Sequence, residues 1–267
     1  MVASAPTGGL KPTDIVIADG THDGGGRTVN PPYGNHTGHE RNNIMTVKKT
    51  TAAAQDEQIR IDRIPAARML VPIVGTSPLI VHAFGQKARM QMLEAQQGKK
   101  RVKQIRDPEA EYRNSLYLLK PGEDGRERYG FPVSAFKAAV VGSARFYDDK
   151  RLSMTALKSM LFITGEPGLN DPQQMVEIHG EPRMREDVVR LSGISRTADL
   201  RYRGEFPEWS ATLDVTFISS AISQQSVLSL IDAAGFGVGV GEWRPQKNGS
   251  YGCFRIDEDR DVKLIEA

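Results

Sequence analysis

The chain contains little of what disulfide-bonded, zinc-binding and membrane proteins require. Its 267 residues include one cysteine, Cys253, which excludes a disulfide framework and any zinc motif built on cysteines. No apolar run approaches the roughly 18 residues of a membrane span, and the N-terminus lacks the basic-then-apolar order of a secretory signal. We therefore expect a cytoplasmic protein that does not associate with membranes.

Histidines and the common catalytic motifs are also scarce. Three of the five histidines, His22, His36 and His39, lie in the N-terminal stretch, and His82 and His179 have no metal-ligand spacing. The chain has no P-loop, no nucleophile-elbow motif and no dinucleotide-binding fingerprint. The sequence thus predicts no enzyme, no cofactor and no bound metal, while an annealing or nuclease activity stays open as an alternative.

Net charge does not by itself predict a polyanionic ligand. Lysine and arginine together number 35, against 33 aspartate and glutamate residues, which gives a formal net charge of +2. Any attraction to nucleic acid must therefore come from local clusters of basic residues.

Composition changes along the chain and predicts its domain organisation. Residues 1–58 are rich in glycine, proline, threonine and asparagine, with little apolar periodicity, which predicts a disordered or non-native tail. Met45 opens a more ordinary segment, and we expect native translation to start there. Residues 59–267 are predicted to form a single α+β domain with a helical, basic insertion at about residues 86–120.

Hydrophobic periodicity divides this domain into strands and helices. The predicted strands cover residues 69–75, 79–81, 160–163, 174–179, 186–191, 209–218 and 250–256. The predicted helices cover residues 87–97, 108–119, 133–146 and 223–234. Two helices packed on one face of a mainly antiparallel sheet form the split βαβ, or ferredoxin-like, arrangement, which is the fold class that we expect.

Single residues predict local details of these elements. Pro72 favours an edge strand or a bulge. Ser134 is a candidate N-cap and Gly235 a candidate left-handed C-cap residue. In the first predicted helix, the candidates for burial are Met90, Met92 and Leu93.

The segment from Gly235 to Gly252 holds six glycines in eighteen residues. Glycines of this kind, here Gly237, Gly239 and Gly241, let a phosphate or base approach the peptide N–H groups closely. The segment also supplies positive charge and aromatic stacking faces, carried by Trp243, Arg244, Lys247 and Tyr251. This chemistry predicts a binding site for a nucleic-acid strand. The alternative is a tight helix-to-strand connection with Trp243 in the core.

Two other stretches concentrate basic side chains that can attract phosphates. The first comprises Lys99, Lys100, Arg101, Lys103 and Arg106, and the second comprises Arg196, Arg201 and Arg203, with Tyr202 as an interleaved stacking face. The alternatives are a solvated charged loop for the first stretch and a solvent-exposed hairpin for the second.

Three segments, taken in order, resemble the RAMP superfamily, which includes the backbone subunits of CRISPR effector complexes. They are Gly75–Leu79, Tyr129–Ala139 and Gly237–Gly252. The resemblance implies a modified RNA-recognition-motif core, a characteristic helix start that contains Lys137, and a glycine-rich loop that contacts RNA. This chain departs from the superfamily in two places. Phe136 separates Ala135 from Lys137, and Trp243, Arg244 and Pro245 stand where relatives carry simple arginine and glycine repeats.

The chain also resembles uncharacterised proteins encoded by bacteriophages and prophages, over about residues 66–256. The segments that carry this resemblance are Tyr202–Trp209 and Gly239–Pro245. It implies a viral source, with the host cell cytoplasm as the place of action, and it brings no established activity with it.

We therefore expect a protein of phage origin that binds single-stranded RNA or DNA and assembles along the strand as a homo-oligomer or filament, with other phage proteins as further partners. The alternative is a protein-interaction or assembly factor of a phage complex that has no nucleic-acid ligand. In that case Trp209 and Trp243 would be anchors of the interface.

Overall fold

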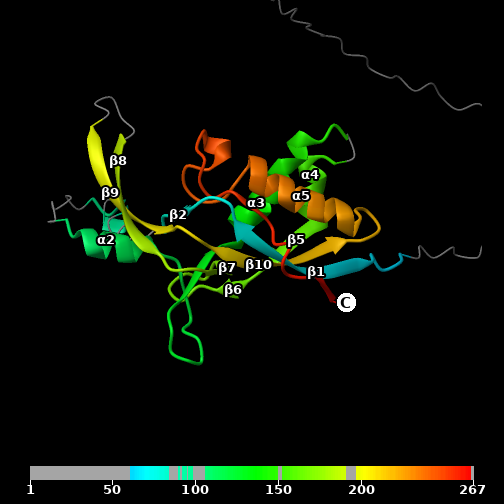
Figure 1. Cartoon of the computed structure of the whole chain (residues 1–267), viewed down its shortest axis with the longest axis horizontal. Coiled ribbons are helices and arrows are strands. Elements are labelled where there is room, and N and C mark those ends of the chain that lie inside the picture. Colours follow the sequence, from blue (N-terminus) through cyan, green and yellow to red (C-terminus); the bar gives the residue numbers. More distant parts are fainter. Residues whose placement is uncertain are drawn as a thin grey trace, which may run out of the picture. The chain divides into compact units, whose positions relative to one another are not determined.

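The fold is built around one long antiparallel strand pair, β1 (Ala66–Gly75) and β10 (Ser210–Ile218), as Figure 1 shows for the computed structural model. The structure describes residues 61–83, 90, 92–94, 96–98, 106–149, 152–190 and 197–265, which all lie in one unit, Ile59–Ala267. The predicted tail and five predicted basic residues fall outside the described residues, namely Lys99, Lys100, Arg101, Lys103 and Arg196.

Two sheets contain all the strands of the described residues, and every neighbouring pair is antiparallel. The main path of the nine-stranded sheet is β11 (Phe254–Ile256), β1, β10, β7 (Gln174–His179), β4 (Arg128–Pro132) and β3 (Leu118–Leu119). Three short strands extend it: β12 (Lys263–Ile265) on β1, β5 (Leu161–Thr164) on β10 and β6 (Glu166–Pro167) on β7. The smaller sheet has the order β2 (Leu79–Val81), β9 (Ala198–Phe206) and β8 (Arg183–Arg190).

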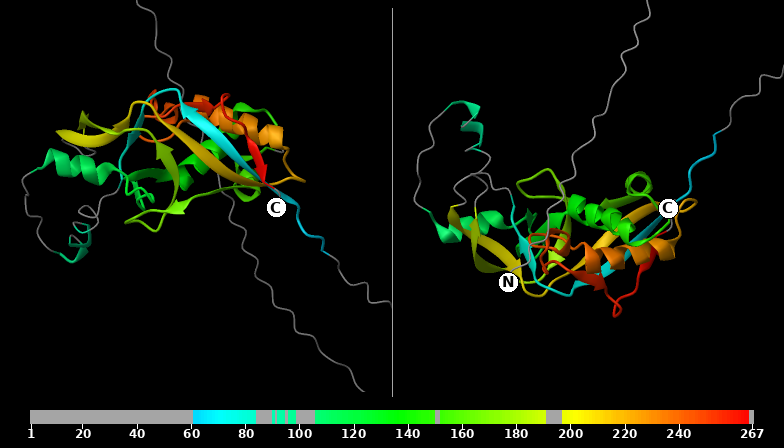
Figure 2. Two further views of the ribbon diagram at one scale, coloured as in Figure 1. Left: turned by 60° about the horizontal axis from the view of Figure 1, so that its bottom comes forward. Right: turned by 90° about the horizontal axis from the view of Figure 1, so that it is seen from above.

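Two helices, α3 (Val133–Ser143) and α5 (Gln224–Gly237), lie on the same side of the β1–β10 pair (Figures 1 and 2). Alternate residues of β1 and β10, such as Val71 and Leu213, are fully buried in the core beneath these helices because successive side chains of a strand point to opposite faces. Burial of this face contributes to the stability of the domain.

The chain order β1, α3, β5 and β7, β10, α5, β11 is that of the split βαβ arrangement. Both β5 and β7 pair antiparallel with β10, at successive places along it, so they act together as one interrupted strand. The predicted α+β, ferredoxin-like fold is confirmed.

Local capping explains where two of the helices begin. Asp107 accepts a hydrogen bond from the backbone N–H of Ala110 at the start of α2 (Pro108–Ser115), and proline occupies its first turn. Ser223 caps α5 through the N–H of Ser226. The predicted helix 108–119 is too long, because the chain leaves α2 after Ser115 and enters β3.

The sequence prediction misses α4 (Met154–Met160), which Ser153 caps. This helix has only two turns, too few for a periodic pattern to be detected. The predictions for Ser134 and Gly235 were wrong. Helix α3 begins at Val133, so Ser134 lies inside it and its hydroxyl accepts from Gln173 at 3.0 Å. Gly235 is a buried residue within α5, where a Cβ would collide with the carbonyl oxygen of Phe254.

Burial was predicted wrongly for three side chains of the insertion. The described residues of the predicted helix 87–97 are largely helical, but Met90, Met92 and Leu93 are 54–64% exposed. Pro72 also differs from expectation, since β1 lies inside the sheet between β11 and β10. Pro72 lies between the stretch of β1 that pairs with β12 and the stretch that pairs with β11. Its missing N–H group therefore removes no hydrogen bond to either strand.

Candidate nucleic-acid interface

The glycine-rich loop, Val238–Gly252, connects α5 to β11 and is fixed to the chain around β2. The N–H of Glu242 donates to the carbonyl of Ile80 at 3.0 Å, and the N–H of Gly252 donates to that of Pro78 at 2.8 Å. Within the loop, the N–H of Tyr251 donates to the carbonyl of Trp243 at 3.1 Å. The loop is therefore held at its base and across its width.

The glycines of this loop serve its tight closure. Gly239 and Gly241 adopt φ values of +69° and +78°, a region that other residues rarely occupy. A Cβ on Gly241 would lie 2.5 Å from the carbonyl oxygen of Ile80. Gly237 is the last residue of α5 and lies under the ring of Phe146. The tight-connection alternative is thus correct for the glycines.

Three backbone amides of the loop glycines are used within the protein. The N–H groups of Gly239, Gly249 and Gly252 donate to carbonyls within the protein, at 2.8–3.1 Å. These three donors are therefore not free to bind a phosphate, and the phosphate contacts expected of Gly237 and Gly241 remain predictions.

Trp243 is the most unusual residue of the loop. Its φ is +53°, a strained conformation for a bulky residue, and the residue is 40% exposed. The alternative that placed Trp243 in the core was therefore wrong. Trp209, the other predicted interface anchor, is instead 3% exposed and donates its indole N–H to the carbonyl of Ser77 at 2.9 Å.

Trp243, Tyr251 and Arg185 come together, and we call them the aromatic platform. The two rings meet edge to face with centroids 6.3 Å apart. The guanidinium of Arg185 lies 4.9 Å from the ring centroid of Tyr251 and 5.9 Å from that of Trp243, within the range of cation–π attraction. The platform combines two aromatic side chains with a positive charge.

Arg185 was not among the residues that the sequence singled out. It lies on β8 and donates to Asp187 and Glu205, each at 2.8 Å, and both carboxylates are buried. Burial acts to raise the pKa of Glu205, but hydrogen bonds from Arg183 and Arg185 outweigh it and hold that pKa below its ordinary value. This carboxylate pair fixes Arg185 against the loop.

A signal for Arg185 does exist in the sequence. Charged residues occupy every second position from Arg183 to Asp187, and again from Arg201 to Glu205. The two segments are neighbouring strands in register, so these side chains share one face of the β8–β9 hairpin. The prediction of an exposed hairpin was correct in topology but not in exposure, since part of this face is buried.

The predicted basic residues of β9 lie on the same face at different depths. Arg203 is 6% exposed, with Nη1 3.7 Å from Oδ2 of Asp187. Neither Nε nor Nη1 of Arg203 has a hydrogen-bond partner among the described residues. Arg201 is more exposed and pairs with Asp199 at 3.1 Å. Contacts of these two arginines with nucleic acid remain predictions.

Lys137 is not brought to the loop. Its Nζ donates to the carbonyl of Lys158 at 2.9 Å and lies 4.6 Å from the ring centroid of Phe162. Lys247, by contrast, is an exposed loop residue. The loop residues Trp243 and Tyr251 thus meet the β8–β9 hairpin through Arg185, while the contacts of Lys137 lie elsewhere.

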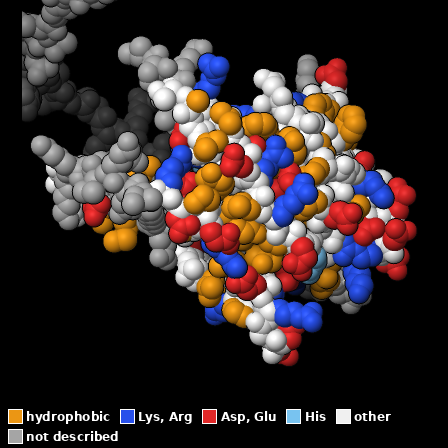
Figure 3. All heavy atoms as spheres, turned by 60° about the vertical axis from the view of Figure 1, so that its left-hand side comes forward, with side chains coloured by type: hydrophobic (Ala, Val, Ile, Leu, Met, Phe, Trp, Pro, Cys, Tyr) orange, Lys and Arg blue, Asp and Glu red, His pale blue; other side chains and the backbone are white. Residues whose placement is uncertain are grey.

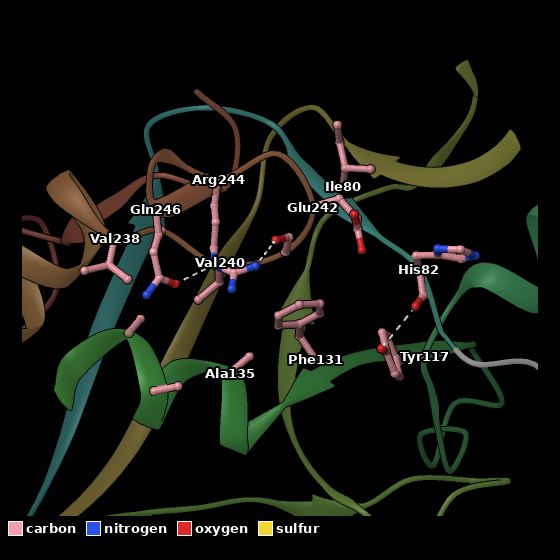
Figure 4. Close-up of a pocket in the computed structure, with 14 residues that line it drawn as sticks. Ile80, His82, Tyr117, Phe131, Ala135, Val238, Val240, Glu242, Arg244 and Gln246 are labelled. Atoms are coloured by element: carbon pink, nitrogen blue, oxygen red, sulfur yellow. Dashed lines mark hydrogen bonds between the residues drawn. The ribbon is translucent and has the colours of Figure 1, made fainter. Parts of the chain in front are cut away.

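A pocket of about 170 Å³ opens between the loop, β2 and the first turns of α3 (Figure 4). Arg244 lies along it, with Nη1 donating to the carbonyl of Gly241 at 3.0 Å and Nε to the side chain of Gln246 at 3.2 Å. Glu242 and His82 also line it. The pKa of His82 lies below its ordinary value, mainly because the ring is partly buried and next because of the positive charge of Arg203.

The surface around the hairpin carries both signs of charge. On the face in Figure 3, Lys and Arg side chains alternate with Asp and Glu, and hydrophobic side chains lie between them. Several arginines of the hairpin and its neighbours are ion-paired, for example Arg106 with Asp199 at 2.6 Å and Arg183 with Glu205 at 2.7 Å. These two positive charges are therefore partly neutralised by acidic partners.

No known protein family matches the sequence of this chain, and no curated protein matches it. Among solved structures, the crystal structure of Cmr6 from Pyrococcus furiosus is similar, at a TM-score of 0.34 and 11% sequence identity. The similarity covers 73% of this chain and 100% of that one. At this TM-score the similarity carries no argument about function, so the chemistry of the site has to come from its own residues.

Among the described residues, no helix is long and apolar enough to cross a membrane. Nor do these residues contain a group of three or more histidine, cysteine, aspartate or glutamate side chains placed to hold a metal ion.

Proposed function

We propose that this protein binds single-stranded RNA or DNA without hydrolysing it, and that bases stack on the aromatic platform. The observation that carries the proposal is Trp243, a 40%-exposed indole held in a strained conformation beside Tyr251 and Arg185. Backbone strain of about 1–3 kcal/mol persists only where the surroundings enforce it, and it gathers at functional sites. Aromatic faces beside a guanidinium suit any base, because every base has a π-face.

Phosphates would be met by basic side chains around this platform. Lys247 is exposed on the loop, and Arg183 is 65% exposed in its side chain although it pairs with Glu205. Because few such charges are free of acidic partners, we expect affinity to depend on salt only moderately. The slope of log affinity against log salt concentration should correspond to about two or three neutralised phosphates. Stacking would contribute the larger share.

The proposal includes assembly of several copies along one strand in a phage-infected cell, as the RAMP and phage resemblances imply. A fold that presents its platform on a loop at one side leaves other surfaces free for neighbouring copies. Mass photometry of the protein on oligonucleotides of increasing length would test this part, since one bound copy at every length contradicts it.

The direct test of binding is fluorescence anisotropy with labelled single-stranded RNA, single-stranded DNA and duplex DNA over a salt series. We expect both single strands to bind more tightly than the duplex, and the Trp243→Ala variant to lose most of this affinity. Equal binding of duplex and single strands, or no binding by folded protein, contradicts the proposal. Mg²⁺-dependent cleavage of the same probes would favour a nuclease instead.

A second candidate function is assembly with another protein, and exposed phenylalanines favour it. Phe236 is 86% exposed near the end of α5, and Phe146, which covers the neighbouring Gly237, is 52% exposed. Side chains of this size are often the anchors of protein interfaces. Light scattering after size exclusion separates the two candidates, because self-association or complex formation that ignores oligonucleotide favours assembly.

A further inference from the structure

The pocket beside the loop is separate from the aromatic platform, although consecutive residues serve both. Trp243 contacts Arg185 on the hairpin, whereas the side chain of Arg244 lies along the pocket and approaches α3 (Figure 4). The loop therefore presents two different surfaces. The platform is open and aromatic, and the pocket is partly enclosed and chemically mixed.

The polar groups of the pocket are arranged as donors and acceptors that remain available. Gln246 uses its side-chain oxygen to accept from Nε of Arg244 at 3.2 Å, which leaves its NH₂ group to donate. Nη2 of Arg244 donates to no described group, and the carboxylate of Glu242 has no hydrogen-bond or ion-pair partner among the described residues. A guanidinium and a carboxylate thus line one pocket without pairing to each other.

Part of the pocket wall is apolar and includes an aromatic ring. Ile80, Val238 and Val240 are buried on the side of β2 and the loop, and Phe131 and Ala135 lie opposite them (Figure 4). The volume of about 170 Å³ is below the roughly 300–1,000 Å³ of sites for drug-sized ligands. Such a space suits a small flat ring system that carries donors and acceptors on its edges.

We propose that this pocket binds a single nucleobase, with guanine preferred, and so gives sequence preference to the strand that the platform binds. The inference rests on the proposed function. Guanine offers adjacent N1–H and N2–H donors to one carboxylate, which is Glu242. Its O6 and N7 atoms are acceptors that match a guanidinium, which is Arg244, and Gln246 donates beside it. Bases of single strands can be splayed out and read on these edges.

The test uses the full chain and labelled oligouridylates of about 12 nucleotides, either uniform or with one central G, A or C. We expect the G-containing strand to bind about tenfold more tightly than the others, as one bidentate base contact does. Glu242→Gln should abolish this preference while binding of plain oligouridylate is kept. Ala135→Leu, which fills the pocket without changing a polar group, should do the same.

Two controls separate failure of the pocket from failure of the platform. Glu123→Gln changes an exposed carboxylate in a turn and should keep the preference for the G-containing strand. Trp243→Ala should lower the affinity for all four strands by a similar factor. A wild-type protein that binds all four strands equally, or a preference that survives Glu242→Gln, overturns the base pocket but leaves strand binding intact.

A separate arm with free GMP distinguishes a base within a strand from a free nucleotide. If no oligonucleotide binds, strand binding itself is wrong, and ligand-detected NMR with GMP then decides the pocket alone. If GMP binds to wild type and Glu123→Gln but not to Glu242→Gln, the pocket is supported as a site for a free nucleotide. If GMP does not bind, or binds independently of Glu242, the pocket proposal is overturned.

Discussion

The two exposed β surfaces of this protein differ in what they offer a ligand. On the face of the β1–β10 pair that points away from the helices, Arg68 donates to both carboxylate oxygens of Asp214, at 2.6 and 2.8 Å, beside Thr212 and Thr216. None of the residues of β1 and β10 on that face is aromatic. The β8–β9 face instead holds Arg185 against Trp243 and Tyr251. The two faces thus offer a ligand different chemistry.

The physical difference between these faces is burial. Arg68 and Asp214 have side chains that are 46% and 20% exposed, so their attraction is screened by water. Asp187 and Glu205 are 6% and 3% exposed, and they hold Arg185 in an environment where an uncompensated charge is costly. In the second arrangement, the arginine that lies beside the two aromatic rings is held by buried carboxylates.

The largest expected effect follows from this difference. Replacing Arg185 by alanine leaves two buried carboxylates with poorer partners and should reduce the free energy of unfolding by about 3 kcal/mol. Replacing Arg68 by alanine should cost less than about 1 kcal/mol. Urea unfolding of both variants measures the two changes, and equal losses would contradict the comparison.

The next effect concerns the closure of the loop. Gly241→Ala places a Cβ at φ +78° and against the carbonyl oxygen of Ile80, so we expect a loss of about 2 kcal/mol or more. Gly125 is the matched control, since its φ is +75° and no atom lies within 4 Å of an added Cβ. Gly125→Ala should cost about 1 kcal/mol. Thermal unfolding of the pair separates steric contact from backbone strain.

A smaller effect concerns the ligand and not stability. Trp243→Ala should weaken binding of single-stranded oligonucleotides about tenfold, the loss of one stacked base, with little change in unfolding temperature because the ring is 40% exposed. Phe162, a 47%-exposed aromatic on the main sheet, is the control. If Phe162→Ala weakens binding as much in the same anisotropy assay, the ligand lies on the main sheet instead.

The smallest expected effect is a dependence of stability on pH. The pKa of Glu205 is lower in the folded chain than its ordinary value of 4.5, so ionised Glu205 stabilises the fold above that pH. This contribution falls as the pH drops below 4.5 towards the folded pKa. Urea unfolding at pH 7 and pH 3.5 should show that the free energy of unfolding falls less on acidification in Glu205→Gln than in wild type or Glu123→Gln. An equal fall in all three proteins would show that Glu205 does not contribute.

Much of the fold could be predicted because it depends on local patterns. Alternating burial identified the long β10 and the core of β1, and the spacing of Val227, Leu230 and Ile231 identified α5. These residues form their elements for reasons contained within ten or fifteen positions of the chain. The two-turn helix α4 was missed because it is too short, and β9 was foreseen only as an arm of a hairpin because its charged residues lack an apolar period.

The sequence alone determined that a glycine-rich loop follows the last long helix and brings Trp243, Arg244, Lys247 and Tyr251 close together, since these residues are neighbours in the chain. Only the tertiary structure decided which of them face a ligand. Arg185 reaches the loop from a strand more than fifty residues away, and the amides of Gly239, Gly249 and Gly252 are already bonded inside the protein. Burial and pairing depend on contacts across the whole chain, and no local pattern contains them.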